Sequence, residues 1–268
     1  MADFDNKVVV ITGGSEGIGK ALVEQFLANG AKVATCGRNY DKLYLLQSTH
    51  AGEPLMIHTA DVSKEIDCKN FIAAVVDTFG TIDILINNAG ISMRALFVDV
   101  ELDTLRRVMD VNFWGTVHST KFALPYIIRN KGSVVAISSI AGYRGLPGRS
   151  GYSASKFAVN GWMEALRTEL LSTGVNVMWA CPGFTASNIR NVALDKDGKA
   201  QGESPLEEKK LMPAEECAAY IVKAIKKRRR TLVLTANGKQ TVLLNRFFPS
   251  LLDRLVKIFF YKNGVLVK

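Results

Sequence analysis

The stretch Lys7-Val-Val-Val-Ile-Thr12-Gly-Gly-Ser-Glu-Gly-Ile-Gly19 decides the fold. It begins with a β-branched run, which favours a buried strand, and passes through closely spaced glycines into a helical pattern over 19–29. Glycines between a strand and a helix allow a tight turn and let the backbone approach a pyrophosphate at the helix N-terminus. The spacing of Gly13, Gly17 and Gly19 is wider than the usual GxGxxG, so the strand-to-helix context carries this interpretation.

Short apolar runs alternate with helical patterns along the rest of the chain. We expect further strands at 31–36, 55–59, 82–86, 133–138, 176–180 and 231–234, and helices beginning at 41 and covering 66–79, 102–128, 152–171 and 213–227. Pro125 lies near the end of the longest helix and is a candidate kink. Alternation of this kind is typical of parallel strands joined by right-handed crossovers. The sequence therefore predicts an α/β fold of the Rossmann type, a doubly wound seven-stranded parallel sheet with helices on both faces, in one domain over 1–236.

The positive charge of the chain is concentrated near its C-terminus. The chain has 268 residues, 48% of them apolar, and a net charge of +9. The segment from Ile221 onward holds twelve of the 34 Lys and Arg residues but one of the 25 acids, Asp253, so its net charge is +11 and that of the first 220 residues is −2. A near-neutral body with a basic tail suggests an anionic partner for the tail, either a membrane surface or another polyanion.

The cysteines and the N-terminus point to a reducing compartment. Cys36, Cys68, Cys181 and Cys217 are far apart and lack any CxxC or Cys/His spacing for a metal, so we interpret them as small buried hydrophobes. The first residues contain acids and no signal-peptide core, and no apolar run reaches the ~18 residues of a spanning helix. We therefore expect a cytoplasmic protein without a metal.

The end of the second predicted strand bears on the type of dinucleotide. About 20 residues after the glycines, an acid would bind the ribose 2′-OH of NAD, whereas a basic residue accommodates the 2′-phosphate of NADP. The strand ends Thr35-Cys-Gly-Arg38-Asn39, and the guanidinium of Arg38 can pair with a phosphate. We therefore expect NADP(H) rather than NAD(H). Glu16 in the glycine loop argues against this choice, and a solvated surface arginine is the alternative for Arg38.

Tyr152 and Lys156 open the helix predicted over 152–171. They lie at i and i+4, so the phenol and the ammonium point the same way. A free phenol has a pKa of about 10, and a neighbouring ammonium lowers that pKa, which makes the tyrosine a better general acid and base. Because the same spacing is common on solvated helix faces, the pair needs support from other residues.

Two polar residues give that support. Ser139 follows the fifth predicted strand, and ligands bind at the carboxyl ends of strands in such sheets, so its hydroxyl could hold a substrate carbonyl beside the phenol. Its neighbour Ser138 suits a local turn better. Asn112 interrupts an apolar helical stretch and either satisfies a helix carbonyl or holds a water.

Together these segments resemble the short-chain dehydrogenase/reductase (SDR) family. The matching pieces occur in the family's order and spacing from residue 7 to about 235, and they are TGGSEGIG (12–19), Asp61-Val62, NNAG (87–90), Asn112, Ser139, YSASK (152–156) and Pro182-Gly183. The C-terminal region is similar to the 11β-hydroxysteroid-dehydrogenase-like branch, many of whose members reduce lipophilic ketones at membranes. The N-terminal membrane anchor common in that branch is not seen in this sequence.

The resemblance implies roles for single residues. Ser139 would polarise the carbonyl, Tyr152 would transfer the proton, Lys156 would bind the nicotinamide ribose and tune Tyr152, and Asn112 would support a water leading protons to Lys156. The residues expected to contact the cofactor are Gly13, Ser15, Gly17, Ile18, Gly19, Arg38, Asp61, Val62, Asn88, Tyr152, Lys156, Pro182, Gly183, Thr185 and Ser187. The family's threonine that contacts the nicotinamide amide falls on Ser187, with Thr185 as a second candidate.

Two further sets of residues concern the substrate: the segment 185–211 and the walls of the substrate pocket. Residues 185–211 fall where the family keeps a mobile lid, and their charges are expected to face water. The pocket is expected to be mostly apolar, favouring a lipophilic ketone, and its predicted walls are Ile91, Met93, Tyr143, Leu146 and Phe184.

The C-terminal extension, residues 237–268, is predicted to contain an amphipathic helix. Ser250 to Asp253 resembles a capping box. The expected apolar face consists of Leu251, Leu252, Leu255, Val256, Phe259 and Phe260. With the basic run 226–230 upstream, this pattern suits an interfacial helix on an anionic membrane. Docking on the body or on a sister subunit is the alternative, and no recognition motif supports nucleic acid.

We therefore predict an NADP(H)-dependent oxidoreductase that interconverts a carbonyl and an alcohol, forms a homodimer or homotetramer through the helices over 102–128 and 152–171, and is cytoplasmic or peripheral on a membrane. Two alternatives stay open. One is an NAD-dependent dehydrogenase of a polar alcohol or sugar, and the other is a non-catalytic, cofactor-binding regulatory protein on the same fold.

Overall fold

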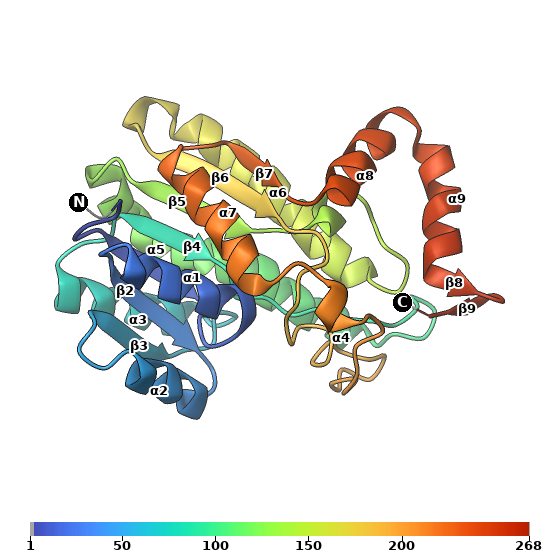
Figure 1. Ribbon diagram of the computed structural model, residues 1–268, viewed down its shortest axis with the longest axis horizontal. Coiled ribbons are helices and arrows are strands. Elements are labelled where there is room, and N and C mark those ends of the chain that lie inside the picture. Colours follow the sequence, from blue (N-terminus) through green and yellow to red (C-terminus); the bar gives the residue numbers. More distant parts are fainter. Residues whose placement is uncertain (1–2, 268) are drawn as a thin grey trace.

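The computed structural model describes residues 3–267, and its centre is a parallel sheet between two layers of helices (Figure 1). Seven strands pair in the order β3-β2-β1-β4-β5-β6-β7. They are β1 (Val8–Thr12), β2 (Lys32–Gly37), β3 (Leu55–Thr59), β4 (Ile84–Asn87), β5 (Ser133–Ile137), β6 (Asn176–Cys181) and β7 (Thr231–Val233). The predicted Rossmann-type fold is confirmed. The strand order changes direction at β1, so the carboxyl ends of β1 and β4 flank the crevice where such sheets bind ligands.

The strands are apolar on both sides because helices cover both faces. The α-helices of the body are α1 (Gly17–Ala28), α2 (Tyr40–Thr49), α3 (Glu65–Phe79), α4 (Leu102–Met109), α5 (Gly115–Arg129), α6 (Ser150–Glu169) and α7 (Ala214–Lys226). In β1, Val8 and Val10 join the core under α3, α5 and α6, whereas Val9 and Ile11 join the core under α1 and α7. Short turns of 3-10 helix occur at Ile140–Gly142, Leu171–Thr173 and Glu208–Lys210.

The long helix predicted over 102–128 has a different internal geometry. A π-helical segment, Asp110–Trp114, joins α4 to α5, and α5 continues past Pro125 to Arg129. Such π-segments in α-helices are frequent at functional sites, and Asn112 lies in this one. Trp114 and Phe157 on the helices expected to mediate self-association are exposed, and that association stays a prediction.

The C-terminal extension forms two helices and a small hairpin on the right of Figure 1. Its elements are α8 (Ala236–Phe247), α9 (Pro249–Phe260), β8 (Tyr261–Lys262) and β9 (Val265–Leu266). The predicted capping box is wrong, because α9 begins at Pro249, where proline is favoured in the first helical turn, and its N-cap is Phe248. Ser250 is therefore already inside the helix.

One side of α9 docks on the body and the other side is exposed. Leu252, Val256 and Phe260 are buried and form a small core with Leu146, Leu244, Tyr261 and Leu266. The other three residues of the predicted apolar face, Leu251, Leu255 and Phe259, are exposed. Ile258, which was not assigned to that face, is 75% exposed. Docking on the body thus accounts for three of the apolar side chains of α9. Among the described residues, no helix is both long enough and apolar enough to cross a bilayer.

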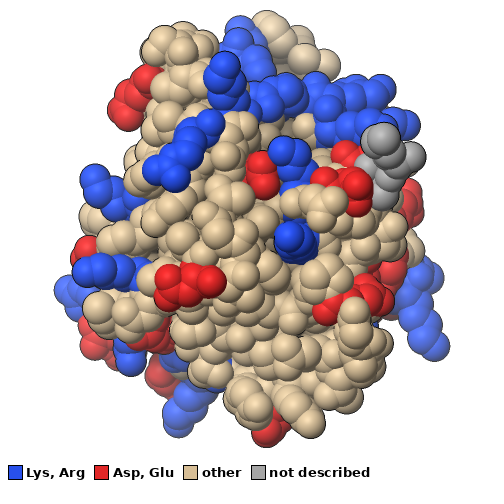
Figure 2. Space-filling view, turned by 90° about the vertical axis from the view of Figure 1, so that its left-hand side faces the viewer, with Lys and Arg blue, Asp and Glu red and all other residues tan. Residues whose placement is uncertain are grey.

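The basic run 226–230 and the extension lie at opposite ends of β7, which is an edge strand of the sheet. It joins the end of α7 to the start of β7, whereas α8 follows the carboxyl end of β7. Figure 2, which faces the side of the N-terminus, shows Lys and Arg gathered along the upper edge of that face. Arg228 donates to the carbonyls of Lys131 and Gly174, and Lys226 pairs with Asp3. The run is therefore separated from the amphipathic helix by the length of β7 and by α8.

Candidate active site

The glycine loop forms a cradle at the start of α1. Gly13 and Gly17 have φ values of 70° and 54°, which favour glycine, and a Cβ at Gly19 would collide with the carbonyl of Gly13. The N-cap residue Glu16 makes no capping bond with its side chain, so the first amides of α1 remain for an anion. Asn88 fixes the loop, because its Nδ2 donates to the carbonyls of Thr12 and Gly13 at 3.0 and 2.9 Å. This geometry fits the pyrophosphate of a dinucleotide.

One cavity of about 750 Å³ runs from this loop to the carboxyl ends of β4, β5 and β6. All the residues expected to contact the cofactor line it, as does Ser139. They come from segments far apart in the sequence, and the structure thus brings them together as the sequence predicted. The volume and the glycine cradle suit a dinucleotide with a substrate beside it.

The adenosine end of the cavity carries two cations. Arg38 lines the cavity at the end of β2, together with Lys42 in the first turn of α2. Nζ of Lys42 lies 2.7 Å from a carboxylate oxygen of Glu16, so the charge of Glu16 is already paired. The negative charge of Glu16 is therefore a weaker argument against a phosphate at this end of the cavity. The sequence interpretation missed Lys42, although its position four residues after Arg38 on the same segment was a usable signal.

Tyr152 and Ser139 meet at the other end of the cavity. Both side chains line the cavity, and α6 begins at Ser150, so the phenol projects from the first turn of the helix. Burial raises the pKa of Tyr152, while the nearby Ser139 hydroxyl and then the charge of Arg149 act to lower it. The assignment of a turn to Ser138 is wrong, since Oγ of Ser139 accepts from the Ala141 amide at 3.1 Å.

Lys156 is buried and points toward the backbone of β5. Its Nζ donates to the carbonyl of Ile137 at 2.9 Å and lies 5.7 Å from the centre of the Tyr152 ring. Burial lowers the pKa of Lys156 to about 8. The ammonium of Lys156 therefore lies near the Tyr152 ring.

Asn112 lies behind the cavity wall. It is 1% exposed, accepts from the Ile91 amide at 2.8 Å, and donates to the Ile91 carbonyl and the Ser155 hydroxyl at 3.0 and 2.9 Å. It therefore ties the end of β4 to α6 through a peptide outside the helix, rather than satisfying a helix carbonyl. The bond from Asn112 to Ser155 also fixes the backbone next to Lys156, because Ser155 is the residue before it.

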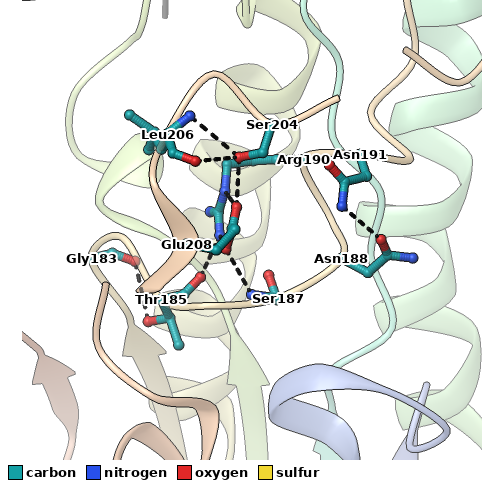
Figure 3. A network of polar contacts seen from close by, with 9 residues as sticks. All are labelled: Gly183, Thr185, Ser187, Asn188, Arg190, Asn191, Ser204, Leu206 and Glu208. Atoms are coloured by element: carbon teal, nitrogen blue, oxygen red, sulfur yellow. Dashed lines mark hydrogen bonds and ion pairs between the residues drawn. The ribbon is translucent and has the colours of Figure 1, made fainter. Parts of the chain in front are cut away.

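An ion pair joins two parts of the lid segment 185–211 to each other (Figure 3). Arg190 contacts both carboxylate oxygens of Glu208 and also donates to the carbonyl of Thr185 at 2.7 Å. The Arg190 side chain is 11% exposed, so the expectation that the lid charges face water is wrong for this residue. The Arg190 bonds lower the pKa of Glu208 to about 2. Neither residue was singled out in the sequence, because local spacing does not reveal their pairing.

Thr185 and Ser187 occupy different positions beside the lid. Thr185 is buried next to Gly183, whereas Ser187 lies close to Gly17 of the glycine loop, with its amide donating to Glu208 at 3.3 Å. Ser187 is thus on the phosphate side, and Thr185 is nearer the strand end.

The substrate end of the cavity is apolar in part. Ile91, Leu146, Phe184 and Val192 line it. Two predicted wall residues are elsewhere: Met93 is fully buried, with its sulfur against Gly151, and Tyr143 accepts a bond from Trp179 at 3.0 Å. Arg149 and Arg190 add positive charge to the same cavity.

The short chain dehydrogenase family model matches residues 7–198 of this chain. The chain is 36% identical over 238 residues to dehydrogenase/reductase SDR family member 7B of Mus musculus, covering 86% of this chain and 73% of the relative. It is 34% identical over 257 residues to 11-beta-hydroxysteroid dehydrogenase A of Arachis hypogaea, covering 92% and 73%. A short chain dehydrogenase/reductase of Burkholderia phymatum, solved in complex with NAD, superposes with a TM-score of 0.81 at 25% identity, covering 94% and 97%.

The chain therefore belongs to the short-chain dehydrogenase/reductase family, and it is an NAD(P)-dependent oxidoreductase. Within the family, its relatives place it in the branch of SDR family member 7B and the 11β-hydroxysteroid-dehydrogenase-like proteins.

Proposed function

We propose that this protein uses NADP(H) to interconvert a lipophilic ketone and its alcohol. The observation that carries the proposal is that Ser139, Tyr152 and Lys156 line one end of a cavity whose other end holds a glycine cradle and two cations. A cavity of this kind positions a carbonyl and a nicotinamide side by side.

The residues of the chain would handle the oxygen and its proton. When bound, the nicotinamide cofactor donates hydride to the carbonyl carbon or accepts it from the alcohol carbon. The Ser139 hydroxyl holds the substrate oxygen, and the Tyr152 phenol gives it a proton in the reductive direction and removes that proton in the oxidative direction. Lys156, buried below the phenol, holds a positive charge there below a pH of about 8. Asn112 keeps α6 and the end of β4 in register for this arrangement.

The substitution Tyr152→Phe tests this function. It removes the proton donor while the ring and its packing remain, so we expect turnover of a carbonyl to fall by about 10²–10⁴-fold. NADPH binding, measured by fluorescence titration, should stay unchanged. Tyr44→Phe, at an exposed tyrosine of α2, is the matched control. Near-normal turnover by Tyr152→Phe would contradict the assignment, and a wild type inactive on a broad carbonyl panel would favour the non-catalytic alternative.

The preference for NADP(H) is supported by Arg38 and Lys42 at the adenosine end. Two cations with one of them paired to Glu16 leave net positive charge where a 2′-phosphate would lie. The NAD found in the Burkholderia structure argues for the alternative cofactor, and a direct comparison of the two is needed.

A lipophilic substrate is supported by the continuity of apolar surface at the cavity mouth. Phe184 lines the cavity, and its ring stacks on Phe259 of α9 at 6.1 Å between centres. The exposed side of α9 continues from there through Leu255 and Ile258, with exposed cations at Arg254 and Lys257. We propose that this side of the extension rests on an anionic membrane surface, from which a lipophilic ketone would reach the cavity.

A further inference from the structure

Two apolar residues of the substrate end are backed by helix α9. Leu146 and Phe184 both line the cavity. Leu146 also packs against the small core that the buried side of α9 forms with the body. The ring of Phe184 stacks on Phe259 of the same helix, with 6.1 Å between the ring centres and 25° between the ring planes. The shape of the substrate end therefore depends on the C-terminal extension as well as on the body.

The backbone around Phe184 is held on both sides. Gly183 lies against the side chain of Thr235, and a Cβ on this glycine would come within 2.6 Å of the Thr235 Oγ1. The carbonyl of Phe184 accepts from the amide of Met212 at 3.4 Å, and Thr185 forms a β-bridge with the same residue. A side chain on a fixed backbone moves by rotation about its own bonds. The position of the Phe184 ring is therefore set by the groups that the ring contacts.

Phe259 connects the Phe184 ring to the buried side of α9. Phe184 and Phe259 are each 42% exposed, so their contact removes part of two apolar surfaces from water. Phe259 in turn packs edge-to-face on Phe260, with 5.2 Å between the ring centres, and Phe260 is 3% exposed. A row of three aromatic rings thus links a side chain of the cavity wall to the small core under α9.

We propose that Phe184 limits the size of the carbonyl substrate, and that Phe259 is a positioning residue that holds the Phe184 ring in the cavity wall. The proposal deepens the proposed oxidoreductase function and rests on it. Without the Phe259 ring, the side chain of Phe184 can rotate into the space that this ring leaves, and the substrate end becomes larger. One apolar contact in a pocket discriminates between homologous substrates by about 10–200-fold. The pair should therefore decide how long an alkyl chain beside the carbonyl is accepted.

A series of alkyl phenyl ketones from acetophenone to hexanophenone tests the proposal. Each carbonyl carries one phenyl ring and one alkyl chain, so the length of the chain is what changes. In Phe259→Ala, kcat/KM for hexanophenone relative to acetophenone should rise about tenfold over the wild type, mainly through a lower KM for hexanophenone. Phe259→Tyr keeps the ring and should keep the wild-type ratio. Phe247→Ala, at an exposed phenylalanine of α8, is the matched control and should leave the ratio unchanged.

A double-mutant cycle separates a positioning role from a general effect on the fold. Phe184→Ala should raise the same ratio at least as much as Phe259→Ala does. If Phe259 acts through Phe184, adding Phe259→Ala to Phe184→Ala should change the ratio by less than about twofold. Ketone binding gives a readout without turnover, because NADP⁺ cannot reduce a ketone. In the presence of NADP⁺, the rise in Tm caused by hexanophenone reports binding alone and should be larger in Phe259→Ala than in the wild type.

An unchanged or lower ratio in Phe259→Ala overturns the proposal. Equal losses of kcat/KM for both ketones would leave the ratio unchanged and would assign Phe259 a structural role instead. Effects that multiply in the double variant would show that Phe259 does not act through Phe184, which also overturns the proposal. If the wild type neither binds nor reduces any ketone of the series, the proposed function itself fails. If it reduces these ketones and Phe259→Ala has the same size preference, only the role of the aromatic pair fails.

Discussion

At the scale of single residues, the adenosine end gives the sharpest prediction about the cofactor. Arg38→Asp reverses the charge that would meet a 2′-phosphate, while Lys42 stays paired with Glu16. We expect the Kd for NADPH to rise by about tenfold or more and the Kd for NADH to change far less, since a charge-assisted bond is worth about 1.5–3 kcal/mol. Parallel fluorescence titrations measure this, with Arg129→Asp on the exposed end of α5 as control. An unchanged NADPH/NADH ratio would reject the preference for NADP(H).

Lys156 makes the stability of the protein depend on pH in a defined direction. Its pKa is about 8 in the folded chain and 10.5 in the unfolded chain, so between these values the unfolded chain binds the extra proton. Stability therefore rises with pH across this window, by on the order of 3 kcal/mol. Lys156→Met should lack that rise. Urea unfolding at several pH values from 7 to about 10.5, compared between the two proteins, measures the difference. If the unfolding free energies of the wild type and of Lys156→Met changed with pH in the same way, the prediction of a lowered pKa for Lys156 would be wrong.

The sequence identified the residues that act through fixed local spacing. Tyr152 and Lys156 share a helix turn, and the glycines lie at a strand-to-helix junction, so both could be predicted. The contacts of Arg149 with Phe260 and of Lys42 with Glu16 could not be predicted, because these partners are distant in sequence. The assignments of Met93 and Tyr143 to the cavity wall failed because neighbours in sequence need not face the same cavity. The assignment of a turn to Ser138 failed because the adjacent Ser139 makes the contact to Ala141.

At the scale of elements, the ion pair between Arg190 and Glu208 joins two parts of the lid segment 185–211. The pKa of Glu208 is about 2 when folded, against 4.5 as its ordinary value, so the contribution of this carboxylate is complete above about 4.5 and is lost as the pH falls through about 2. Glu208→Gln should loosen residues 185–211 at neutral pH, because Arg190 loses both of its carboxylate bonds. Limited proteolysis should cut the lid several-fold faster in this variant. Glu207→Gln, at an exposed neighbour paired with Lys210, is the control. Equal rates of cutting would show that other contacts hold the lid.

The elements of the body were predictable because each has its own hydrophobic period. The strands were placed within two residues, and the helices of the body were recognised. The π-helical turn at Asp110–Trp114 was not, since it depends on the bonds of Asn112 to Ile91 and Ser155. Helix α8 and the hairpin were missed because their packing against the body, rather than their own pattern, stabilises them.

At the scale of the whole molecule, the surfaces at the two ends of β7 differ in character. The basic run 226–230 is partly used in bonds to Lys131, Gly174 and Asp3, whereas the exposed apolar side chains belong to the extension. We expect the protein to co-sediment with anionic liposomes. The double substitution Leu255→Asp with Ile258→Asp should reduce this binding strongly, because both new carboxylates would lose their hydration at the membrane surface. Arg228→Ser with Arg229→Ser is the control and should reduce it less. Equal binding by all three would end the membrane proposal, and loss of self-association instead would point to a second copy of the chain.

The packing of Leu266 and Phe260 against the loop at 143–149 also has a consequence for biosynthesis. The sheet up to β6 can form while the ribosome is still translating, but this loop receives its partners only after more than a hundred further residues have been added. Until then Arg149 lacks its contact with the Phe260 ring, and Gly148 lacks its contact with Leu266. A nascent chain halted before α9 would therefore be folded in its body and still immature in its chemistry.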